Sequence, residues 1–241
     1  MTAILSSLRN TVIAGFILTI LMVLAVAGVT GEGQPGGHAW AAFLVRWLHV
    51  LSGVMWIGLL WYFNFVQIPN MGKIPDEQKP AIGKVIAPAA LFWFRWGAMA
   101  TIVTGLILAG MNGYLVDAMT LGLQSGVAKS TAIGIGMWLG IIMWFNVWFV
   151  IWPNQKKALG IVDATADEKA AAGRTAMLFS RTNTLLSLPM LVTMAMNLYS
   201  QGIDPALDLS GMAEITEVVE ACTEISTHPR HPLFAHGGEA V

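Results

Sequence analysis

Five long apolar stretches constrain the fold of this chain more than any other feature. Each is long enough to cross the hydrocarbon core of a bilayer, about 30 Å thick, as a helix. Lipid offers no hydrogen bonds to backbone groups, so a span without a closed barrel has to be helical. The stretches are Thr11–Val29, Trp40–Ile68, Ala90–Met111, Thr131–Trp152 and Thr182–Ser200. The sequence therefore predicts an all-α integral membrane protein, a bundle of five transmembrane helices.

Lysine and arginine are unevenly shared between the two sets of loops, and they favour the cytoplasmic side of a membrane. If five spans alternate, nine of these residues fall on one side and only Lys129 and Arg230 on the other. This asymmetry predicts that the N-terminus lies inside and the C-terminus outside. We expect a five-helix transmembrane domain over residues 1–200 and an extramembrane tail over 201–241 that is acidic and rich in His and Pro. We also expect this tail to dock on a partner protein.

Composition and motifs exclude several classes of protein. A net charge of -1 with 11% charged residues argues against a nucleic-acid partner. Cys222 is the single cysteine, so the chain cannot form an internal disulfide, and no Cys-x-x-Cys-His segment attaches a haem c. Cys222 and three histidines of the tail match no standard zinc spacing, so no metal site is predicted.

Three ionisable side chains fall well inside the predicted spans: Arg46, His49 and Arg95. Such groups are costly in lipid and face the interior of a bundle. At 100° per residue, one face of the second span carries the residues Arg46, His49, Gly53, Trp56, Leu60, Asn64 and Gln67. Two readings stay open. Arg46 extends to the headgroups while His49 bonds a neighbouring helix, or His49 binds a haem b or handles a proton while Arg46 stabilises an anion. His38 lies about 16 Å away along a helix, so a second haem ligand would come from Met or another chain.

Other patterns predict how the helices pack. The fifth span places polar and methionine side chains in one arc around Pro189: Asn183, Ser187, Met190, Met194 and Asn197. Small residues recur every four positions at Gly97, Thr101, Gly105 and Ala109, and again at Gly136 and Gly140, which indicates close helix contacts. Five tryptophans near the span ends are read as headgroup anchors: Trp93, Trp96, Trp144, Trp148 and Trp152.

Three groups of residues resemble the membrane domain of the PuuD-type urate oxidases, also called urate hydroxylases. They are Arg46-Trp47-Leu48-His49-Val50 with Trp56-Ile57-Gly58, then Trp93-Phe94-Arg95-Trp96, and last Pro153-Asn154-Gln155-Lys156-Lys157 with Ser180-Arg181-Thr182-Asn183 and Leu188-Pro189. The resemblance covers about residues 40–200. This chain has Thr182 and Leu198 where that family carries histidines.

The resemblance implies a protein of the bacterial inner membrane that oxidises urate. Full-length members pass electrons to a fused cytochrome c domain, so here the acceptor would be a separate cytochrome. The matching positions make Arg46, His49 and Arg95 the candidate catalytic residues and His49 the candidate cofactor ligand. Urate is an anion at neutral pH and would favour guanidinium contacts.

Two functions remain open from the sequence. With one histidine in the spans and no haem-attachment motif, the first is an accessory subunit that packs with other membrane subunits of a larger redox or energy-converting complex. The alternative is a urate oxidase-like redox enzyme. A transporter is disfavoured, because five spans do not form equal inverted repeats and the spans contain no acidic residue.

Overall fold

The computed structural model describes residues 2–30, 36–123, 125–126 and 128–202, and this part of the chain contains helices and turns but no strand. It begins with α1 (Thr2–Leu5), α2 (Leu8–Thr30), α3 (Gly37–Trp61), η1 (Tyr62–Gln67), α4 (Ile68–Asn70) and η2 (Met71–Lys73). It continues with α5 (Lys79–Ala81), η3 (Ile82–Ile86), α6 (Ala87–Met111), α7 (Leu115–Met119), α8 (Ala128–Phe145), η4 (Asn146–Ile151), α9 (Trp152–Ala158) and α10 (Ala166–Gly202). The all-α prediction is confirmed for these residues.

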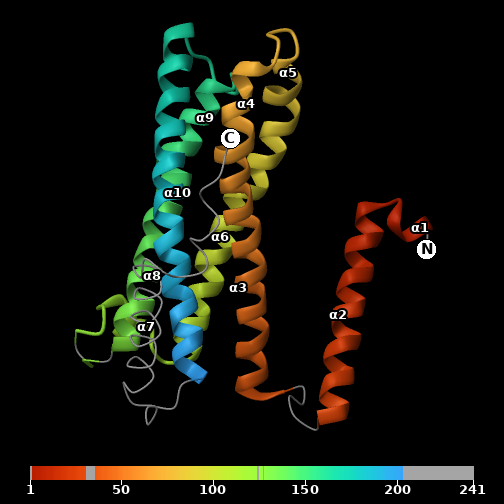
Figure 1. Ribbon diagram of the computed structural model, residues 1–241, viewed down its shortest axis with the longest axis vertical. Helices are drawn as coiled ribbons and strands as arrows, with labels where there is room; N and C mark the ends of the chain where they lie inside the picture. Colours follow the sequence, from red (N-terminus) through yellow and green to blue (C-terminus); the bar gives the residue numbers. More distant parts are fainter. Residues whose placement is uncertain (1, 31–35, 124, 127, 203–241) are drawn as a thin grey trace, which may run out of the picture. The chain divides into compact units, whose positions relative to one another are not determined.

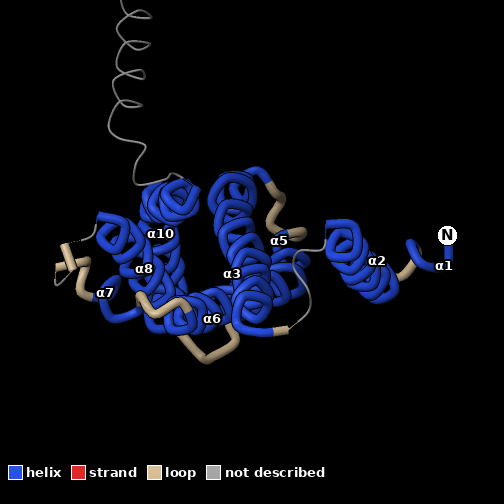
Figure 2. Tube along the Cα trace, turned by 90° about the horizontal axis from the view of Figure 1, so that it is seen from below, coloured by secondary structure: helices blue, strands red, loops and turns tan. Residues whose placement is uncertain are grey.

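The chain divides into a unit of residues 1–193 and a second unit of residues 194–241. Within the first unit, α3, α6, α8 and the adjoining part of α10 run side by side as long helices (Figures 1 and 2). Within the described residues, four helical segments are long and apolar enough to cross a membrane: Leu8–Gly28, Gly37–Lys73, Lys79–Met111 and Lys129–Ala158. The fifth predicted span lies within α10, which is not one of these four. Most of the predicted tail lies outside the described residues.

The most extensive packing in the bundle is between α3 and α6, and small residues allow it. A Cβ atom added to Gly97 would lie 3.3 Å from the backbone nitrogen of Trp56 and 3.6 Å from the carbonyl oxygen of Ser52. The two backbones therefore approach closely at Gly97, which has no side chain to separate them. Between α7 and α8, a Cβ on Gly134 would collide with the backbone carbonyl of Ala118. The predicted packing face of α6 is confirmed.

Three of the long helices contain a π-helical turn, and a proline explains each one. Pro69, Pro88 and Pro153 each follow a π turn after one intervening residue. A proline has no N–H for the carbonyl four residues before it, so the regular ladder is interrupted there. The residue before each proline bonds instead to the carbonyl five residues back, as Trp152 N–H does with Val147. Turns of this kind occur often at functional sites.

One face of α10 is buried at helical spacing. Its buried residues are Ala172, Ala176, Ser180, Asn183, Ser187 and Met190. The intervals of three and four residues form one stripe along the helix, and polar side chains occupy its centre. The predicted arc of Asn183, Ser187 and Met190 is therefore confirmed. The side chain of Asn197 lies outside the described part of the structure.

Candidate functional site

Polar side chains from three elements meet the buried stripe of α10. Trp61 Nε1 donates to Ser187 Oγ at 3.1 Å, and Asn64 Nδ2 donates to Ser180 Oγ at 2.8 Å. On the other side, Asn146 Nδ2 donates to Asn183 Oδ1 at 2.9 Å, and Asn183 Nδ2 donates to the Met143 carbonyl at 2.9 Å. We call the six residues Trp61, Asn64, Asn146, Ser180, Asn183 and Ser187 the polar seam. They join α3, η1 and η4 to α10.

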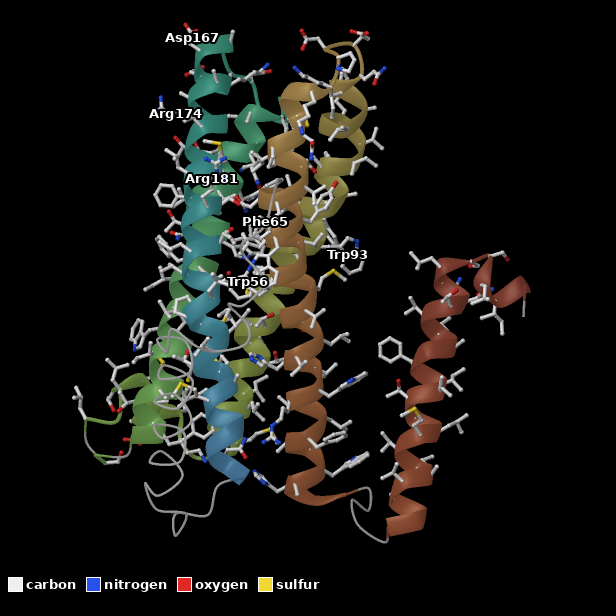
Figure 3. The ribbon with its side chains drawn as sticks, in the orientation of Figure 1. Trp56, Phe65, Trp93, Asp167, Arg174 and Arg181 are labelled. Atoms are coloured by element: carbon white, nitrogen blue, oxygen red, sulfur yellow. The ribbon has the colours of Figure 1, made fainter. Side chains whose placement is uncertain are left out.

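A buried arginine on α6 contacts the η4–α9 segment, which also carries the seam residue Asn146. Arg95 is only 9% exposed, and its guanidinium carbon lies 3.4 Å from the centre of the Trp152 ring. On the next residue, the Trp96 ring contacts the Trp148 ring at 5.5 Å between centroids. Both contacts join α6 to the η4–α9 segment. The headgroup-anchor interpretation did not foresee the contact of Trp152 with Arg95, whereas Trp93 is 58% exposed and points away from the bundle (Figure 3).

The charge of Arg95 has no carboxylate to balance it in the surrounding helices. No Asp or Glu occurs in residues 37–73, 79–111, 129–158 or 169–203. The Trp152 ring stabilises the cation through its π face, but it carries no negative charge. A buried cation without a counter-ion is costly and is usually paired in a folded protein. The site is therefore electrostatically suited to an anion.

Seven buried polar side-chain atoms have no hydrogen-bond partner among the described residues, and one of them belongs to Arg95. Four are donors: Arg95 Nη1, Trp56 Nε1, Trp144 Nε1 and Trp148 Nε1. Three are acceptors: Asn64 Oδ1, Gln67 Oε1 and Gln155 Oε1. Unpaired buried polar atoms are rare in native proteins, and each needs an explanation. Together they could recognise a ligand that offers both acceptors and N–H donors.

His49 faces α6, as the first of its two readings predicts. Its Nδ1 lies 2.9 Å from the Thr101 carbonyl and 3.3 Å from Thr104 Oγ1. A carbonyl oxygen accepts only, so Nδ1 carries the proton and Nε2 retains a lone pair. Gly105 makes the room, because an added Cβ there would lie 2.9 Å from His49 Cε1. We expect Arg46, His49 and Asn64 to face other helices, and this is confirmed for His49 and Asn64.

The three candidate catalytic residues do not meet at one point. His49 contacts Thr101, and Arg95 lies six residues earlier on α6, about 9 Å along the helix axis. Arg46 lies near Tyr114, in the turn that follows α6. Burial raises the pKa of Tyr114, and the positive charge of Arg46 opposes this shift. Among the three candidates, Arg95 is the one that contacts the η4–α9 segment.

The haem b considered from the sequence does not fit the described residues as a bis-histidine site. His49 offers Nε2 as one axial ligand, with Nδ1 held by a carbonyl as is usual for a ligating histidine. The other histidine of this region, His38, has its Nε2 at 2.7 Å from the Met111 carbonyl. No group of three or more His, Cys, Asp or Glu that could hold a metal occurs in the described part of the chain.

Taken together, these features define an all-helical protein with membrane-length helices and a buried, cationic polar site. Residues 111–209 match the family described as Urate oxidase N-terminal. This segment contains four of the six polar-seam residues, together with Trp144, Trp148 and Trp152. The region of the site built by η4, α9 and α10 therefore resembles the N-terminal domain of a urate oxidase. No solved structure matches the chain.

Short stretches of the chain are also similar to 2-isopropylmalate synthases, which are a different class of protein from the urate oxidases. A 2-isopropylmalate synthase of Alcanivorax borkumensis is 67% identical over 42 residues, which is 17% of this chain and 8% of that protein. The synthase of Marinomonas sp. is 40% identical over 88 residues, 36% of this chain and 16% of its own length. The synthase of Paraburkholderia phytofirmans is 55% identical over 42 residues, which is 17% of this chain and 7% of that protein. The chain thus spans less than a fifth of each of these relatives.

Proposed function

We propose that this chain is a membrane urate oxidase-like protein that binds the urate anion between α6, α9 and α10. The observation that carries the proposal is the buried guanidinium of Arg95, whose Nη1 atom has no partner. Urate is planar and anionic, and it presents carbonyl oxygens to donors. The match of residues 111–209 to the urate oxidase family supports the same ligand class.

The uncompensated charge of Arg95 favours an anionic ligand. Arg95 lies among helices that contain no carboxylate, so an anion would supply the missing counter-charge. Hydrogen bonds to a charged donor are stronger than neutral ones, and Trp56 and Trp148 offer further buried N–H groups. A neutral purine would satisfy the donors but leave the buried charge unbalanced. The site should therefore prefer urate to a neutral analogue.

Equilibrium binding tests the proposal. The purified chain in lipid nanodiscs should bind radiolabelled urate, and Arg95→Gln should weaken binding by about 10- to 100-fold, because a charged hydrogen bond is lost. Arg174→Gln is the matched control, since Arg174 is exposed on α10 (Figure 3). Unchanged affinity in Arg95→Gln, or no urate binding by the wild-type chain, would contradict the proposal.

The membrane arrangement also belongs to this proposal: five spans in a bacterial inner membrane, with the N-terminus inside. Lys73 and Lys79 flank one turn between candidate spans, and Lys156 and Lys157 lie at the end of another. Single cysteines introduced at residues 79 and 156 in a Cys222→Ser background should react only with membrane-permeant reagents in intact cells. Labelling of either position by an impermeant maleimide would show that the orientation is wrong.

The accessory-subunit hypothesis stays a prediction, as does an electron acceptor in the form of a separate cytochrome. Co-purification of stoichiometric membrane subunits from native membranes would support the first. Urate consumption that depends on added oxidised cytochrome would support the second. The short synthase matches cover too little of either chain to assign synthase activity here.

A further inference from the structure

We propose that Asn64 determines ligand specificity by accepting a hydrogen bond from a ring N–H of the ligand. This inference rests on the proposed urate site and adds a second contact of opposite character to the anion contact at Arg95. It starts from one unpaired atom, Asn64 Oδ1, which is buried and has no hydrogen-bond partner.

The orientation of the Asn64 amide is fixed by its own donors. Nδ2 donates to the Leu60 carbonyl at 2.9 Å and to Ser180 Oγ at 2.8 Å. The Leu60 carbonyl can only accept, so rotating the amide by 180° would place two oxygens against each other. Both amide hydrogens are thus used within the protein. The unpaired atom is necessarily an acceptor, and it needs a donor from outside the protein.

Asn64 lies in the π turn η1, and Gln67 is the last residue of the same turn. Gln67 Oε1 is also buried without a partner. One turn therefore presents two unpaired acceptors, and the missing groups are donors. A carboxylate or an inorganic anion has no N–H to offer them, whereas a urate or xanthine ring does.

The acceptor and the cation lie at a common level of the α3–α6 pair. The rings of Phe63 and Phe94 are in contact, with centroids 5.8 Å apart. Asn64 and Arg95 are the next residues along the chain after these two phenylalanines. Each also reaches a further helix, Asn64 through Ser180 and Arg95 through Trp152. One planar ligand could therefore place its oxygens toward Arg95 and an N–H edge toward Asn64.

Methylated urates test this assignment, because each replaces one ring N–H by an N–CH₃. We measure the dissociation constants of urate and of 1-, 3-, 7- and 9-methylurate for the full chain in nanodiscs. The wild-type protein should bind at least one methylurate about tenfold or more weakly than urate, since an acceptor then stays unpaired. Asn64→Leu keeps the side-chain volume and should weaken urate binding by about tenfold. In this variant, the dissociation constant of that methylurate divided by the dissociation constant of urate should fall to about one.

The control is Asn70→Leu. Asn70 Nδ2 makes the same local bond, to the Val66 carbonyl at 2.7 Å, but its oxygen already accepts from Lys73 Nζ at 3.0 Å. This variant should leave the ratio unchanged. If Asn64→Leu does not insert stably, Ser180→Ala replaces it, because the amide then loses one of its two anchors. The ratio should fall about threefold in that variant.

Two results would overturn the assignment, and they differ. If urate binds but Asn64→Leu or Ser180→Ala keeps the wild-type ratio of dissociation constants, Asn64 does not accept a hydrogen bond from the ligand. The proposed function then stands. If the wild-type chain binds no urate, both proposals fail. In Arg95→Gln all affinities should fall together with the ratio preserved, because the charge is common to every methylurate ionised under the assay conditions.

Discussion

Replacing Arg95 by methionine should stabilise the protein while it abolishes urate binding. Methionine has similar length and no charge. An arginine in the middle of a membrane helix costs about 3 kcal/mol, whereas a desolvated cation–π contact such as that with Trp152 contributes about 2 kcal/mol. The difference favours methionine by about 1 kcal/mol, which corresponds to a rise in Tm of about 2–4 °C for a chain of this size. A residue kept for ligand binding at the expense of stability has this signature.

The assay is thermal unfolding in one detergent, followed by tryptophan fluorescence, for wild type and Arg95→Met without ligand. Trp152→Leu is the comparison, because it removes the cation–π contact but leaves the buried charge, and it should lower Tm. If Arg95→Met lowers Tm by as much as Trp152→Leu does, the arginine is a structural group. The reasoning from the unbalanced charge would then be refuted.

Three further predictions concern contacts outside Arg95. Gly105→Ala should destabilise the protein by about 1–3 kcal/mol, because the added Cβ displaces the His49 ring; unfolding in denaturant measures this, and an unchanged midpoint would contradict it. Asn183→Ala should cost about 2–4 kcal/mol, since it removes two buried hydrogen bonds; a loss below 1 kcal/mol would show that the seam contributes little. Glu168 caps the start of α10, because the Thr165 N–H and hydroxyl donate to its carboxylate and hold the pKa of that carboxyl below the usual range. The cap stabilises the helix fully when the pH is above the ordinary carboxyl pKa, and this stabilisation is lost as the pH falls through the lowered pKa. Hydrogen exchange at residues 166–169 measures this loss. Below the lowered pKa, the wild type should lose more protection than Glu168→Gln, whose exchange should follow only the intrinsic pH dependence.

Helix periodicity predicted much of the bundle, because burial follows the 3.6-residue repeat. Each residue of the polar face predicted on the second span is buried or half-buried, and His49 and Asn64 bond to other helices. The α10 arc at Asn183 and Ser187 followed from the same reasoning. Small residues at four-residue spacing predicted the approach of α6 to α3, since a Cβ atom at Gly97 would crowd the backbone of Trp56 and Ser52.

The composition of the site could not be derived in this way. Arg95 and Trp152 are far apart in sequence, and no local pattern indicates that the guanidinium of Arg95 packs on the ring of Trp152. The sequence also could not show which residues of α6 face His49, because the antiparallel packing that puts His49 beside Thr101 is a tertiary contact. Pro69, Pro88 and Pro153 were the available signal for the π turns. Their spacing alone does not say which carbonyls change partners.

A structure of the full chain with urate bound in nanodiscs tests the central claim most directly. We predict a urate oxygen about 2.9 Å from Arg95 Nη1, with the opposite edge of the ring toward Asn64. Because these polar atoms are buried, we also expect α10 to separate slightly from η1 and η4 when urate binds. Urate bound beside Arg46, or at the surface of the bundle with Arg95 Nη1 still unpaired, would contradict the account.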